Sequence, residues 1–83
     1  EEELIKRFEE SIKQETSPFF DEEEFETIIT YYQDRSKFKK ALLAANRAVD
    51  QFPYSTELLT RKAQVLSSLE EYEEALQLLE QAQ

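Results

Sequence analysis

The chain has 83 residues, a net charge of −9 and no glycine, cysteine, histidine, methionine or tryptophan. Without histidine and cysteine, the commonest general base and the thiol nucleophile are both missing, and no remaining polar residue lies in a recognisable catalytic motif. We therefore expect a single small domain with no enzymatic activity and no cofactor. The acidic total argues against bulk affinity for nucleic acids or anionic membranes.

Metal binding is also disfavoured, although acids cluster at residues 1–3, 21–24 and 70–74. Consecutive carboxylates on a helix point in different directions, and no calcium-loop spacing is present. We therefore expect no metal site. No apolar run is long enough to span a bilayer, so we expect a soluble protein.

The ends of the chain leave its compartment open. It begins with Glu1 rather than methionine and stops just after Ala82, as an excised or processed piece of a longer protein would. A removed signal peptide is compatible with this start. The cytoplasm is slightly favoured, and a periplasmic or secreted location remains an alternative.

The first predicted helix covers about residues 2–14, with apolar residues on one face at Leu4, Ile5, Phe8 and Ile12. The sequence Thr16-Ser17-Pro18 should end it, because proline disfavours helix in the residue before it.

The second predicted helix begins at Asp21, whose side chain can cap the first turn together with Glu24, in a capping box. Phe20 and Phe25 flank the cap at the spacing of a hydrophobic staple. A buried stripe at helical spacing should follow, made of Phe25, Ile28, Ile29 and Tyr32.

Three further helices are predicted beyond residue 35. One runs from about Ser36 to Gln51 and has an apolar face built largely of alanines, which allows close helix approach. The next begins after a Ser55 cap and should bury Leu59, Ala63, Leu66 and Leu69. The last should begin near Glu71, which makes about five helices in an all-α chain.

The pattern of large and small residues repeats at an offset of 34 residues. Identities recur at Glu23/Glu57, Ala41/Ala75, Leu42/Leu76 and Ala48/Ala82, and aromatic or large apolar residues recur at Phe25/Leu59, Tyr32/Leu66 and Phe38/Tyr72. A fixed period of this length is typical of helical solenoids, in which each unit buries its apolar face on its neighbour.

These positions make residues 22–83 similar to two tetratricopeptide repeats. The resemblance implies an α-solenoid of antiparallel helix hairpins. We expect an N-terminal helix and junction over residues 1–20, a first unit over 21–54, and a second unit over 55–83 that stops before its closing proline. Ser36 and Glu70 depart from the family pattern, because glycine is common at the turn between the two helices.

In this family the concave surface comes mainly from the first helix of each unit. Helical periodicity places one polar face there, made of Glu23, Glu26, Thr30, Gln33, Glu57, Thr60, Gln64 and Ser67. The functional interpretation is a net acidic groove for a peptide or helix of a partner protein with basic character. The alternative interpretation is an ordinary solvated helix face.

Two other surfaces have alternative interpretations. The basic cluster of Arg35, Lys37, Lys39, Lys40 and Arg47 is expected to pair with acidic groups of this protein or of another protein rather than with nucleic acid, because no nucleic-acid-binding fold signature accompanies it.

The last helix places Leu76, Leu78 and Leu79 on a wide arc that one neighbouring helix covers only in part. The principal alternative to a binding scaffold is therefore homodimerisation through this helix, and further repeats of the same chain are another way to cover it.

Overall fold

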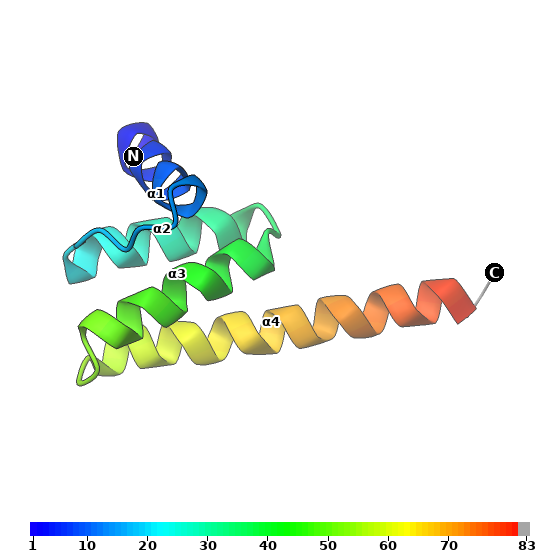
Figure 1. Cartoon of the computed structure of the whole chain (residues 1–83). Helices are drawn as coiled ribbons and strands as arrows, with labels where there is room; N and C mark the ends of the chain where they lie inside the picture. The colour runs from blue at the N-terminus through cyan, green and yellow to red at the C-terminus, as the bar shows by residue number, and fades with distance from the viewer. Residues whose placement is uncertain (82–83) are drawn as a thin grey trace.

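The computed structural model describes residues 1–81, with side chains through residue 80. Four helices follow one another, at Glu2–Lys13 (α1), Glu22–Asp34 (α2), Phe38–Gln51 (α3) and Thr56–Gln81 (α4). Helices α2 and α3 form an antiparallel hairpin, α4 packs mainly on α3, and α1 crosses the other side of α2 (Figure 1). The described part of the chain is all-helical, and none of its helices has the length and apolar character needed to cross a bilayer.

The predicted start of α2 is confirmed. The Asp21 side chain accepts a hydrogen bond from the Glu24 backbone N–H at 2.8 Å, and the Glu24 side chain accepts one from the Asp21 N–H at 3.0 Å. The phenyl rings of Phe20 and Phe25 lie 5.4 Å apart, as the staple requires. These contacts satisfy two helix-end donors and fix the direction in which the chain enters α2.

Two tight turns form without glycine. After α1, the Thr16 N–H donates to the Ser11 carbonyl with Glu15 at φ 56°, and after α2 the Lys37 N–H donates to the Tyr32 carbonyl with Ser36 at φ 57°. Both are Schellman caps, in which a left-handed residue turns the chain away from the helix. Ser36 thereby ends α2 and allows α3 to fold back along it.

The core is aromatic on the α1 side and small on the α3 side. The rings of Phe8 and Tyr32 lie 5.9 Å apart, and those of Phe8 and Phe20 lie 6.4 Å apart. The predicted stripe of α2 is confirmed as fully buried, and α3 buries four alanines. The fully buried residues of these two helices are Phe25, Ile28, Ile29, Tyr32, Ala41, Ala44, Ala45 and Ala48.

The prediction of two helices after residue 55 is wrong. Residues 56–81 form one continuous helix, so residues 1–81 contain four helices rather than about five, and α4 projects past the ends of α2 and α3 (Figure 1). Unlike Ser36, the equivalent Glu70 remains helical. No glycine or proline stands between Ser67 and Glu71 to break the helix.

The buried face predicted for the first half of α4 is also wrong. Leu58 and Val65 are fully buried, whereas Leu59 is 43% exposed and Leu66 45% exposed. Leu58 and Val65 belong to the core, whereas Leu59 and Leu66 lie on a partly exposed side of the helix. Ala82, expected on that fifth helix, lies outside the described residues.

Candidate functional site: an acidic face across α2 and α4

Two open hollows lie side by side along α4, the first of them between α4 and α2, and they share Glu57 and Arg61. The first hollow is lined by Glu1, Glu26, Thr27, Thr30, Tyr31, Asp34, Glu57 and Arg61. The second is lined by Thr56, Glu57, Thr60, Arg61 and Gln64. We call the two together the acidic face, because carboxylates outnumber the one guanidinium in it.

Five of the eight predicted groove residues line the acidic face. They are Glu26, Thr30, Glu57, Thr60 and Gln64. The other three do not line either hollow: Glu23 and Ser67 are exposed, and Gln33 is half-buried. The packing of α4 beside α2 brings the five together.

The carboxylates of Glu26 and Glu57 oppose each other across the two helices. Burial raises the pKa of Glu26, repulsion from Glu57 raises it further, and Arg61 acts in the opposite direction. The Arg61 Nε atom lies 3.8 Å from the Glu26 carboxylate, so this ion pair is loose. The site therefore holds more negative charge than its own cation balances, and a bound cation would lower its electrostatic energy.

The first hollow contains acids that the sequence analysis did not include. Asp34 lies two helical turns after Glu26 on α2, with Thr30 between them. This i, i+4, i+8 spacing places Asp34 on the same helix face as Glu26 and Thr30, so the sequence alone could have indicated it. Glu1 joins from the start of α1, and no periodicity indicates that contribution.

Two of the five residues of the predicted basic cluster attach α3 to α1. Lys40 Nζ lies 3.3 Å from the Glu9 carboxylate, and Arg47 donates a hydrogen bond to Ser11 Oγ at 2.8 Å. The Arg35 guanidinium lies 3.6 Å from the centre of the Tyr31 ring. Lys37 and Lys39 make no ion pair within the described part of the chain.

A third hollow lies at the opposite end of α4, between its outer part and the start of α3. It is lined by Ser36, Lys37, Phe38, Lys39, Lys40, Leu69, Tyr72, Glu73 and Leu76. The three leucines predicted to make an outside contact are not shielded by the described chain. Their side chains are exposed by 43% at Leu76, 66% at Leu78 and 63% at Leu79.

Among residues 1–81, no cluster of three or more acidic side chains is arranged to hold a metal ion. The acidic face offers carboxylate acceptors beside the hydrogen-bond donors of its threonines, Gln64 and Arg61. No family model, curated protein or solved structure matches this chain.

Proposed function

We propose that this chain is a non-catalytic protein-interaction module that binds a basic peptide or helix on its acidic face. The observation that carries the proposal is the convergence of Glu26 and Glu57 from two helices into one hollow, with the loosely held Arg61 as the nearby cation. A lysine or arginine of a partner would stabilise the charged form of Glu26, whose pKa is raised by burial and by repulsion from Glu57.

The sequence resemblance supports the same proposal. We propose that residues 21–54 are a tetratricopeptide-like unit and that the chain is a section of a helical array. The full burial of Ala41, Ala45 and Ala48 against α2 is consistent with the small-residue spacing of that pattern. Arrays of this kind bind partners along extended surfaces formed by successive units.

The binding test uses a peptide selected from a random-sequence phage-displayed library and then labelled for fluorescence anisotropy. Replacing both central acids, as Glu26→Gln with Glu57→Gln, should weaken binding by about tenfold or more, because two charge-assisted contacts are lost. The matched control is Glu3→Gln with Glu71→Gln, which removes the same net charge at exposed positions outside the hollows.

Selected peptides should be enriched in lysine and arginine, and their affinity should fall as salt is added. Affinity should also fall on acidification through the raised pKa of Glu26, because the protonated carboxyl no longer attracts a cation. If the control pair weakens binding as much as the central pair, the interaction depends on net charge rather than on this site, and the proposal is wrong.

A further inference from the structure

One apolar stripe continues along α4 through both halves of the helix. Leu58, Val65, Leu69, Tyr72, Leu76 and Leu79 follow at spacings of seven, four, three, four and three residues. This is the period of a helix seam that packs against one neighbouring helix.

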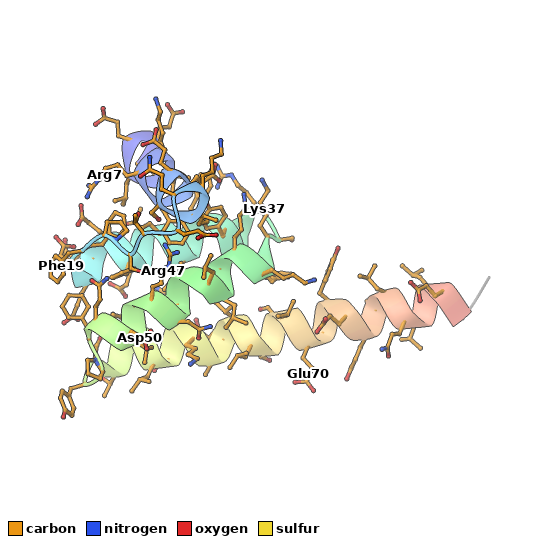
Figure 2. All side chains as sticks on the ribbon, viewed as in Figure 1. Arg7, Phe19, Lys37, Arg47, Asp50 and Glu70 are labelled. Carbon is orange, nitrogen blue, oxygen red and sulfur yellow. The ribbon has the colours of Figure 1, made fainter. Side chains whose placement is uncertain are left out.

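Helix α3 packs on the first half of the stripe. Because α3 begins at Phe38, it does not reach the outer half of α4. Leu58 and Val65 are fully buried, and the ring of Tyr72 still contacts Phe38, with ring centres 5.8 Å apart. Past this point Leu76 and Leu79 are exposed. Figure 2 shows Lys37 at the end of the hairpin and Glu70 where α4 leaves it.

The uncovered half of the stripe can therefore be completed by a helix that lies in line with α3 and antiparallel to α4. The carboxyl end of that added helix would meet the start of α3. Lys37, the N-cap residue of α3, makes no side-chain hydrogen bond to the first turn. Free backbone N–H groups at a helix start attract negative charge. Lys37, Lys39 and Lys40 line the same hollow and add positive charge.

Near its carboxyl end α4 has the negative charge that this position requires, at Glu80. Residues 70–80 contain five acids and no base, at Glu70, Glu71, Glu73, Glu74 and Glu80. Its carboxyl end also carries the negative end of the helix dipole. Glu73 lines the hollow with the lysines of its own chain, whereas Glu80 does not, because the straight helix carries its carboxyl end away from α3.

We infer that the outer half of α4 binds the outer half of α4 of a second copy of this chain, in an antiparallel pair with two-fold symmetry. Leu76 and Leu79 of the two copies pack together, and the acidic end of each helix lies at the lysines that begin α3 of the other. A two-fold axis uses the same patch on both copies, so apolar centre meets apolar centre and acidic end meets basic end.

The pairing also brings Glu73 of one copy toward Glu80 of the other, because both residues flank the stripe on one side. Lys37 and Lys39, which lack ion pairs among residues 1–81, supply the opposite charge at each end.

The proposed dimer contact shares no residue with the acidic face, so either proposal can fail without the other.

The first experiment is sedimentation equilibrium of the full chain over a wide concentration range. We expect a reversible dimer. Leu79→Glu should raise its dissociation constant by about a hundredfold or more, because a buried leucine is lost from both copies. The matched control is Leu78→Glu, which adds the same charge one residue away at a similarly exposed position outside the stripe, and it should retain the dimer.

Far-UV circular dichroism of each variant verifies that the helices remain. A wild-type chain that stays monomeric at every concentration would overturn the inference. This is the result expected if residues 71–81 fold back onto Leu59 and Leu66. Equal loss of the dimer in the Leu78 and Leu79 variants would overturn it too, because the stripe would not be the contact.

A charge exchange tests the orientation of the pair. Lys37→Glu with Lys39→Glu should weaken the dimer by about tenfold, since acids then face acids at both ends. Adding Glu80→Lys should restore most of the affinity. A dimer that is unchanged by the lysine substitutions, or that is not rescued by Glu80→Lys, would contradict the antiparallel arrangement.

Discussion

Tyr32 connects three helices through one side chain. Its ring is fully buried against Phe8, and its hydroxyl donates a hydrogen bond to the Glu9 carboxylate at 2.7 Å. Lys40 of α3 reaches the same carboxylate. Burial and the nearby Glu9 raise the pKa of Tyr32, whereas the hydrogen bond from Tyr32, together with Lys40, lowers the pKa of Glu9.

We expect Tyr32→Phe to lower the free energy of unfolding by about 1 kcal/mol at neutral pH, because the ring remains and only the hydrogen bond is lost. The Glu9 pKa is depressed in the folded state, so its stabilising contribution is present above the ordinary value of 4.5 and is lost as the pH falls through the folded value. The difference between the two proteins should therefore shrink on acidification.

Urea unfolding of both proteins between neutral and acidic pH measures this difference. A difference that does not depend on pH would mean that the hydroxyl acts through packing rather than through the Glu9 carboxylate.

At the scale of the element, α2 is fixed at both ends by local contacts. Asp21 and Glu24 cap its beginning reciprocally, and Ser36 turns the chain at its end. An acid at the beginning also interacts favourably with the helix dipole, whereas Asp34 lies at the end where a negative charge is unfavourable.

These opposite positions predict opposite effects of one substitution. Asp21→Ala should lower the free energy of unfolding by about 1 kcal/mol through loss of the cap. Asp34→Ala, the matched control on the same helix, should leave stability unchanged or raise it by a few tenths of a kcal/mol. Thermal unfolding followed by circular dichroism measures both, and equal destabilisation by the two variants would show that the cap is not the cause.

The contrast between α2 and α4 also belongs to this scale. Both begin with a side-chain cap, and Ser55 Oγ accepts a hydrogen bond from the Leu58 N–H at 3.2 Å. Ser36 takes the left-handed conformation just after α2, whereas the equivalent Glu70 remains inside α4. Helix α4 runs on past Glu70, which leaves Leu59 and Leu66 half exposed, although their counterparts Phe25 and Tyr32 are buried.

At the scale of the whole molecule, α1 is part of the core rather than an appended segment. Phe8 is fully buried between Phe20 and Tyr32, and Ser11 is buried where Arg47 of α3 contacts it. A chain of 83 residues has little stability to spare, because small domains bury a smaller share of their surface.

Phe8→Ala should therefore lower the free energy of unfolding by about 3–5 kcal/mol, as expected for a large cavity in a core. Leu78→Ala, at an exposed position on α4, should change it by less than about 0.5 kcal/mol. Urea unfolding provides the measurement. A small effect of Phe8→Ala would mean that α1 contributes little to the stability of the other helices.

The sequence by itself determined the features that depend on neighbouring residues along the chain. The all-helical class, the capping box of Asp21 and Glu24, the buried stripe of α2 and the alanine face of α3 follow from spacing within one helix, and the structure confirms them. Five of the eight predicted groove residues line the two hollows, because helical period places them on outer faces of two helices that pack side by side, and their role as a groove stays a prediction.

Only the tertiary structure decided which side of α4 is buried. The first half of α4 has two apolar faces, one with Leu59 and Leu66 and the other with Leu58 and Val65, and the prediction that the first is buried is wrong. Packing on α3 and α2 buried the second, which continues through Leu69 into an unbroken helix. Local spacing does not distinguish the two faces, because both keep the helical period, and the positions of α3 and α2 determine which face is covered.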